Sequence, residues 1–120
     1  MYDYAHVHLL GRVIENAQIV LNDEGKPSKA FLTIVCNISF KRKDELDIRT
    51  IYRKVLVLGS LAKYVKDCQS GDSEGLKGRL VHVVGMMDNE LGGDRQEIIL
   101  VSHADGGFLK IIDRRQNSNE

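Results

Sequence analysis

The 120-residue sequence contains no tryptophan, one proline and two cysteines, and its 17 lysine and arginine residues are balanced by 17 aspartate and glutamate residues. The scarcity of proline argues against a proline-rich ligand, and the absence of tryptophan argues against a tryptophan-anchored pocket. A chain with zero formal charge is neither a strongly basic nucleic-acid coat protein nor an acidic disordered segment. No apolar run approaches the roughly 18 residues that a membrane span needs, so we expect no membrane partner.

The two cysteines, Cys36 and Cys68, lie far apart and form no C-x-x-C motif. They do not indicate a disulfide scaffold, and we expect two free thiols packed as small apolar side chains in a reducing compartment. The residues from Met1 to Tyr4 resemble neither a secretory signal nor an arginine-rich transit peptide. We therefore expect any targeting segment to be absent from this chain.

Hydrophobic residues make up 42% of the chain and charged residues 28%, as in an ordinary globular protein. The length suits one domain with one modest core. We expect this domain to span residues 1–113, followed by a polar tail over residues 114–120.

Segments with the composition and alternation of β-strands are 6–14, 30–40, 50–58, 80–87 and 97–102, with 108–112 as a candidate short strand. The second of these places Leu32, Ile34, Cys36 and Ile38 on one side, which is typical of a half-buried strand. Gly11 suggests a bulge or a sharp coil in the first strand. The charged residues 41–47 predict an exposed hairpin loop, and residues 88–95 a short hairpin connection.

The hydrophobic period changes after Gly59. Leu61, Tyr64, Val65 and Cys68 follow the i, i+3, i+4, i+7 spacing of an amphipathic helix. We expect this helix to begin with Ser60 as its N-cap and to end near Cys68. The small polar residues 69–75 after it indicate a flexible linker.

Three strands, one short helix and two strands are the element order of an OB-fold, a five-stranded, partly open barrel whose helix lies between the third and fourth strands. The sequence therefore predicts an all-β OB-fold. An SH3-like barrel lacks the central helix, and an α/β fold needs more helices.

Four segments also resemble those of bacterial and mitochondrial single-stranded DNA-binding proteins in the right order: 6–13, 52–62, 78–85 and 106–112. The resemblance implies that Phe40 and Tyr52 stack on bases and that Lys54 meets phosphate. It also implies pairing with a second copy or another OB-fold protein through the first strand, by way of His6, Val7, His8, Leu9 and Leu10. The family implies the mitochondrial matrix or the bacterial cytoplasm as the location.

The chain departs from that family at three points. Leu58 stands where many members have a third aromatic residue. The connection between strands four and five is short and acidic, with Asp88, Glu90 and Asp94 against Arg95, and the acidic C-terminal tip of bacterial members is absent. We therefore expect weaker nucleic-acid binding than in the family. The OB-fold subunits of the kinetoplastid mitochondrial RNA-editing complex are a second resemblance, which implies weak binding of single-stranded RNA and pairing with other OB-folds.

Aromatic and basic residues interleave between Phe40 and Lys54, as binding of a single strand requires. The basic residues are Lys41, Arg42, Lys43, Arg49, Arg53 and Lys54, opposed by three acids, and a solvated hairpin with compensating charges is the alternative interpretation. The candidate binding residues are Phe40, Lys41, Arg42, Lys43, Tyr52 and Lys54, with single-stranded DNA or RNA as the ligand.

No metal site, cofactor or enzymatic activity is expected. His6, His8, His82 and His103 have no cysteine or carboxylate at a recognisable zinc-ligand spacing. The chain lacks a nucleophile elbow, a P-loop and a dinucleotide-binding turn. Two function hypotheses remain: a single-stranded nucleic-acid-binding module, and an OB-fold scaffold subunit of an assembly such as an RNA-editing complex that acts mainly through protein contacts.

Overall fold

The computed structural model describes residues 6–71, 73–89 and 97–112, so that the predicted tail over 114–120 and most of the acidic connection lie outside the described residues. The elements are β1 (His6–Val13), β2 (Gln18–Leu21), β3 (Pro27–Arg42), β4 (Glu45–Leu58), α1 (Ser60–Ser70), β5 (Leu80–Asn89), β6 (Glu97–Val101), a 3-10 turn (His103–Asp105) and β7 (Phe108–Ile111). No helix of these residues is long and apolar enough to cross a membrane.

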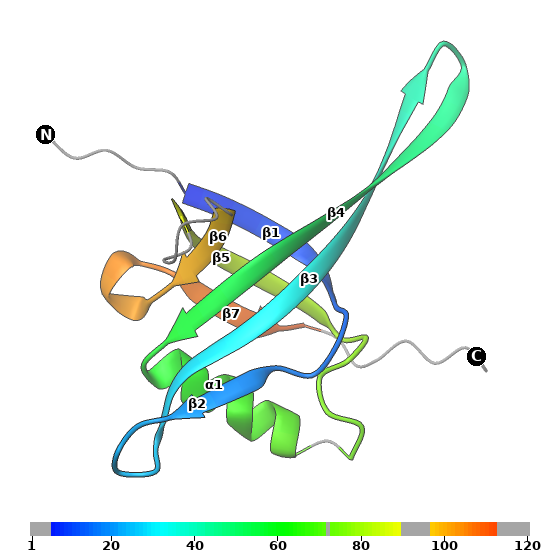
Figure 1. Ribbon diagram of the computed structural model, residues 1–120. Coiled ribbons are helices and arrows are strands. Elements are labelled where there is room, and N and C mark those ends of the chain that lie inside the picture. Colours follow the sequence, from blue (N-terminus) through cyan, green and yellow to red (C-terminus); the bar gives the residue numbers. More distant parts are fainter. Residues whose placement is uncertain (1–5, 72, 90–96, 113–120) are drawn as a thin grey trace, which may run out of the picture.

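Five of the strands close into a ring. β1 pairs with β3, β3 with β4, β4 with β6, β6 with β5, and β5 with β1 again. The β4–β6 pairing is parallel and the other four are antiparallel. With α1 between the third and fourth strands of the ring, this is the OB-fold arrangement, and the predicted fold class is confirmed (Figure 1). β2 extends the ring beside β3, and β7 lies beside β5.

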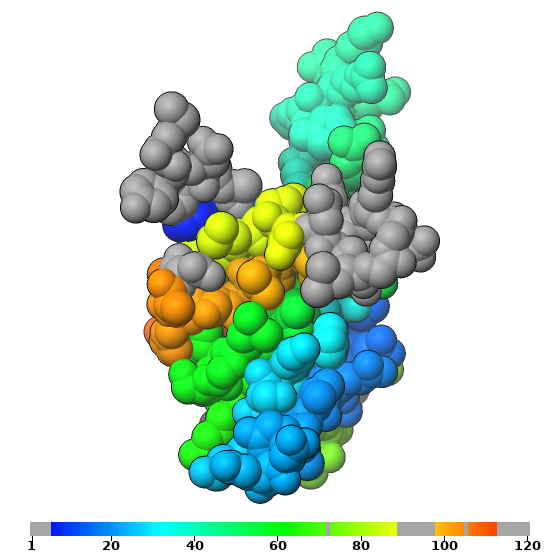
Figure 2. Space-filling model, turned by 60° about the vertical axis from the view of Figure 1, so that its left-hand side comes forward, coloured from blue at the N-terminus to red at the C-terminus, as the bar shows by residue number. Residues whose placement is uncertain are grey.

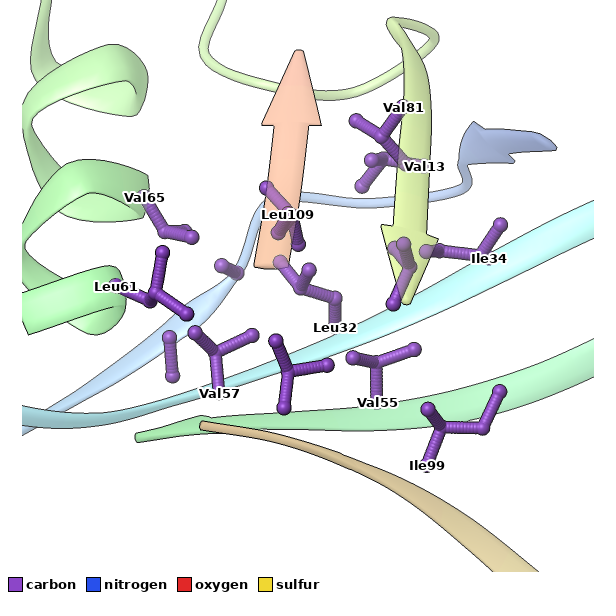
Figure 3. Close-up of a cluster of buried hydrophobic side chains, with 14 of the residues drawn as sticks. Val13, Leu32, Ile34, Val55, Val57, Leu61, Val65, Val81, Ile99 and Leu109 are labelled. Carbon is purple, nitrogen blue, oxygen red and sulfur yellow. The ribbon is translucent and has the colours of Figure 1, made fainter. Parts of the chain in front are cut away.

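Branched aliphatic side chains fill the interior of the ring, and α1 contributes Leu61 and Val65 to the same cluster (Figure 3). The predicted helical stripe is confirmed, because Leu61 and Val65 are buried and Tyr64 and Cys68 pack against the core. The hydroxyl oxygen of Tyr64 accepts a hydrogen bond of 3.1 Å from the backbone N–H of Ile111, which joins the helix to β7.

Gly11 allows β1 to meet β3 closely. β1 pairs with β5 from His6 to Arg12 without a register shift, and it also pairs with β3 at Arg12 and Val13. A Cβ atom on Gly11 would lie 2.4 Å from the carbonyl oxygen of Val35. The continuous register is not that of a bulge, and the glycine instead leaves room for a neighbouring strand.

Cys36 is buried beside this contact, and its thiol donates a hydrogen bond of 3.1 Å to the carbonyl oxygen of Leu10. Burial raises the pKa of the Cys36 thiol above its usual value, and the positive charge of Arg53 offsets part of this effect. The thiol therefore keeps its proton at neutral pH and remains a donor to β1.

The predicted hairpin is present, but its loop is shorter than the predicted residues 41–47. β3 continues to Arg42 and β4 begins at Glu45, so that only Lys43 and Asp44 form the turn, with φ angles of 52° and 68°. Positive φ at both central residues is the geometry of a two-residue turn whose twist matches that of the strands it joins. Charged side chains are compatible with strands here because both faces of the hairpin meet solvent.

Three expectations around α1 need correction. The N-cap residue is Gly59, with φ 67° and no side-chain capping bond, and the helix continues to Ser70. The predicted linker over residues 69–75 begins inside the helix, because Gln69 belongs to α1. Gln69 bonds to Ala17 through both ends of its carboxamide, at 2.7 and 3.1 Å. These partners are 52 residues apart in the sequence, so local composition gave no sign of the contact.

Candidate nucleic-acid interface

The outer face of β3 and β4 presents two rings on either side of a lysine. Leu32, Ile34 and Val55 point into the core, so the residues between them in sequence point outward. The register places Phe31 opposite Leu56, Thr33 opposite Lys54 and Val35 opposite Tyr52. We name Phe31, Thr33, Tyr52, Lys54 and Leu56 the outer face.

Both rings of the outer face are accessible. Tyr52 is 60% exposed and Phe31 is 37% exposed. Lys54 follows Tyr52 on the same side of β4 at about 7 Å, and it lies diagonal to Phe31 at about 7–8 Å. Flat rings flanking a cation are the combination that binds bases and phosphates of a single strand.

The arm, which we define as residues 37–50, projects from the body of the protein (Figure 1, Figure 2). Its six cross-strand pairs run from Asn37↔Thr50 to Arg42↔Glu45, and in the described residues they pair with no other strand. All its residues are exposed. The arm has basic side chains beside large apolar ones, which are Ile38, Phe40, Leu46 and Ile48.

The structure separates the two aromatic residues that the sequence grouped together. Phe40 pairs with Asp47, and it shares its parity along β3 with the core residue Cys36, whereas Tyr52 pairs with Val35 on the outer face. Phe40 and Tyr52 therefore lie on opposite faces of the β3–β4 ribbon. Five residue steps separate Phe40 from Val35, or about 17 Å along the strand.

The predicted basic residues divide in the same way. Lys41 pairs with Leu46 on the side of Tyr52 and Lys54, Arg42 pairs with Glu45 on the side of Phe40, and Lys43 lies in the turn. The predicted set thus forms two surfaces, of which the one with Tyr52 and Lys54 adjoins the body of the protein.

A cavity of about 330 Å³ opens beside the outer face. It is lined by Phe31, Thr33 and Lys54 of the outer face, by Leu32, Val55 and Ile98, and by Glu15, Asn16 and Gln18 from β2 and the connection before it. The sequence reasoning missed Phe31, Glu15 and Gln18. The odd parity of Phe31 in its strand was the available signal, but its proximity to Lys54 depends on the β3–β4 register.

Hydrogen bonds fix the rim of this cavity to the body. The carboxamide oxygen of Asn16 accepts bonds from the backbone N–H groups of Leu76, at 2.7 Å, and Lys77, at 3.2 Å. The adjoining Ala17 is held by Gln69. Residues 15–18 are therefore positioned before any ligand arrives.

The predicted pairing strand, β1, has one open edge. The N–H of Val13 bonds to Arg79 before β5, and the N–H of Ile14 bonds to Thr33 of β3. Because backbone groups alternate along an antiparallel strand, His8 directs its N–H and C=O away from β5, to an edge where no described strand lies.

The five predicted interface side chains point in two directions. Val7 and Leu9 pack against the core, whereas His6, His8 and Leu10 are exposed, Leu10 by 57%. The ring of His8 lies 6.1 Å from that of His82, which meets Phe108 edge-on at 5.1 Å. Among the described residues, no group of three or more histidine, cysteine, aspartate or glutamate side chains could hold a metal ion.

Comparisons with known proteins found no matching family model and no matching curated protein. Solved structures do match. A Plasmodium falciparum SSB in complex with single-stranded DNA has a TM-score of 0.71 and 21% identity over 94% of this chain and 98% of that one. A small single-stranded DNA-binding protein from Streptomyces coelicolor has a TM-score of 0.62 and 11% identity over 93% and 96%.

A deletion variant of the single-stranded DNA-binding protein from Thermus aquaticus has a TM-score of 0.66 and 16% identity, over 92% of this chain and 51% of that one. All three likenesses extend over nearly the whole of this chain. The resemblance found in the sequence is thus confirmed in three dimensions, and the chain has the OB fold of single-stranded DNA-binding proteins.

Proposed function

We propose that this chain is a non-catalytic module that binds single-stranded nucleic acid along the outer face of β3 and β4. The observation that carries the proposal is the exposed ring of Tyr52 next to Lys54, on the pair of strands with which OB-folds bind oligonucleotides. A tyrosine that is 60% exposed contributes little to the core, so stability does not account for it. The three structural neighbours are single-stranded DNA-binding proteins, which supports the same function.

The proposed mechanism combines stacking with charge. Bases stack on Tyr52 and Phe31, Lys54 meets a phosphate between them, and Lys41 extends the contact onto the arm on the same face. A strand that continues around the edge of the arm then meets Phe40 on its other face. Each stacked base contributes about 1–3 kcal/mol. With two rings at the body and zero net charge on the chain, the affinity is modest.

Titration of the purified chain with fluorescent oligo-dT and oligo-U at several salt concentrations tests this function. The logarithm of the affinity is expected to fall with the logarithm of the salt concentration, with a slope of about −0.7 for each neutralised phosphate. Two to four contacts therefore give a shallow slope of about −1.4 to −2.8. Affinity for duplex DNA equal to that for the single strands would contradict the proposal, because base faces are hidden in a duplex.

We also propose that β1 pairs with a second copy or with another OB-fold chain through its open edge, since an unpaired strand edge offers backbone groups to a partner. A His8→Pro variant is expected to shift the protein from dimer to monomer in light scattering at tens of micromolar. Proline removes an N–H that faces the open edge, whereas the β1–β5 ladder keeps its bonds. A wild-type monomer with no affinity for an OB-fold partner would overturn this proposal.

The second candidate is a scaffold subunit of a larger assembly, such as an RNA-editing complex, with weak binding of single-stranded RNA. The exposed apolar side chains of the arm favour it, because large apolar groups gathered on a surface mark protein contacts. The titration separates the two candidates. Binding of neither oligonucleotide by a folded chain excludes the first and leaves a scaffold role through protein contacts alone.

A further inference from the structure

We propose that the cavity beside Phe31 receives one nucleobase of the bound strand and favours a base that carries an exocyclic amino group. This inference rests on the proposed function and extends it, because it gives the outer face a preference among bases. It concerns Phe31, Gln18 and Glu15, none of which the sequence identified.

The ring of Phe31 has the position of a stacking platform inside the cavity. Phe31 pairs with Gln18 on β2 and with Leu56 on β4, so the three side chains share one face. The ring is 37% exposed and lines the cavity together with Gln18. A volume of about 330 Å³ lies at the low end of the range for small-molecule sites, which suits one base rather than several.

The cavity also lies where a bound strand would pass. Lys54 lines the cavity, and it also follows Tyr52 on the outer face of β4. A strand stacked on Tyr52 with a phosphate at Lys54 brings its next base to Phe31, which lies about 7–8 Å from Lys54 on the diagonal. The cavity and the stacking site on Tyr52 can therefore serve neighbouring nucleotides of one strand.

The polar groups of the rim select among bases. The Glu15 carboxylate accepts hydrogen bonds and donates none, and the Gln18 carboxamide does both. Within the part of the chain that the structure describes, neither side chain has a hydrogen-bond or ion-pair partner, whereas the oxygen of Asn16 is engaged by Leu76 and Lys77. Adenine, cytosine and guanine offer an exocyclic amino N–H to a carboxylate. Thymine and uracil offer only the ring N3–H, which lies between two carbonyl oxygens that repel a carboxylate.

The test is a set of four oligonucleotides: oligo-dT, and the same strand with one central dA, dC or dG. At least one amino-bearing base is expected to tighten binding roughly fivefold or more over oligo-dT, as one good hydrogen-bonded base pairing allows. Glu15→Gln is expected to reduce that preference to less than about twofold, because the new amide can also bond to a carbonyl oxygen. Its affinity for oligo-dT should be unchanged or higher.

Two phenylalanine variants provide the matched comparison. Phe31 and Phe108 are equally exposed, at 37% each, but Phe108 lies on β7, away from the cavity lining. Phe31→Ala is expected to weaken binding of all four oligonucleotides about fivefold or more, within the range for loss of a stacked base, and Phe108→Ala less than twofold. Thermal unfolding of both variants shows whether the loss is one of binding or of fold.

Each outcome bears on one claim. Equal binding of the four oligonucleotides by the wild type overturns the preference while leaving the proposed function in place. A preference that survives Glu15→Gln overturns its assignment to the Glu15 carboxylate. If the folded chain binds none of the oligonucleotides, both the inference and the proposed function fail.

Discussion

A Gly11→Ala variant is expected to lose roughly 3 kcal/mol or more of its free energy of unfolding, at the upper end of the cost of overpacking a core. The added Cβ would lie 2.4 Å from the carbonyl oxygen of Val35, 2.7 Å from Sγ of Cys36 and 2.8 Å from a methyl group of Ile34. The first neighbour is backbone in a paired strand, and it cannot rotate away. Either β1 or β3 has to move at the point where the ring closes.

Urea denaturation followed by circular dichroism measures this loss, with Gly25→Ala as the control. Gly25 also has no side chain, but nothing lies within 4 Å of the Cβ that alanine would add, and only its φ of 80° is unfavourable. The control is therefore expected to lose about 1–2 kcal/mol, the cost of left-handed backbone for a residue with a Cβ. A smaller loss at Gly11 than at Gly25 would mean that the β1–β3 contact adapts and does not hold the ring closed.

Replacing Tyr52 and Phe40 together by alanine is expected to weaken oligonucleotide binding at least about tenfold, since each stacked ring contributes about 1–3 kcal/mol. The losses of binding free energy caused by the two single substitutions should be nearly additive, because residues more than about 10 Å apart rarely influence each other's contribution. Tyr52→Ala is expected to have the larger effect, since Tyr52 adjoins Lys54 and Phe40 lies on the other face of the ribbon. Fluorescence anisotropy measures all three variants.

Ile38→Ala is the control on the arm. Ile38 lies two residues before Phe40 on the same face and is similarly exposed, at 47% against 40%, but it has no ring to stack. The melting temperature of every variant should stay within a few degrees of the wild type, because these side chains are largely in solvent. If the double substitution leaves the affinity unchanged, the aromatic residues have another role and the binding surface lies elsewhere.

The parts of the fold that the sequence predicted depend on local patterns. The alternation of Leu32, Ile34 and Cys36 identifies the buried side of β3, and the spacing of Leu61 and Val65 identifies the buried side of α1. The order of the elements then indicates the OB-fold, because few topologies combine these elements in this order. In each case, the pattern of residues a few positions away in the same helix or strand is enough to predict which side chain is buried.

The parts that the sequence missed depend on contacts between distant residues. Asn16 is hydrogen-bonded to Leu76, which is 60 positions away in the sequence. Because local composition does not show such a contact, residues 69–75 had the sequence pattern of a linker, although hydrogen bonds at Gln69 and Leu76 hold both ends. The faces of Phe40 and Tyr52 depend on the β3–β4 register, which the turn at Lys43 and Asp44 sets. A turn of three residues here would have placed Phe40 and Tyr52 on the same face, because the side-chain period of a strand is two.

The length of the arm can change without any change to the hydrophobic core. Among the described residues, all of the buried side chains lie outside residues 37–50, and the six outer pairs of β3 and β4 pair with no other strand. Deleting two residues from each strand of the arm keeps every remaining side chain on its present face, because the side-chain period of a strand is two. Insertions and deletions made in such steps would lengthen or shorten the molecule by about 7 Å at a time, which allows related sequences to vary in span while sharing one core.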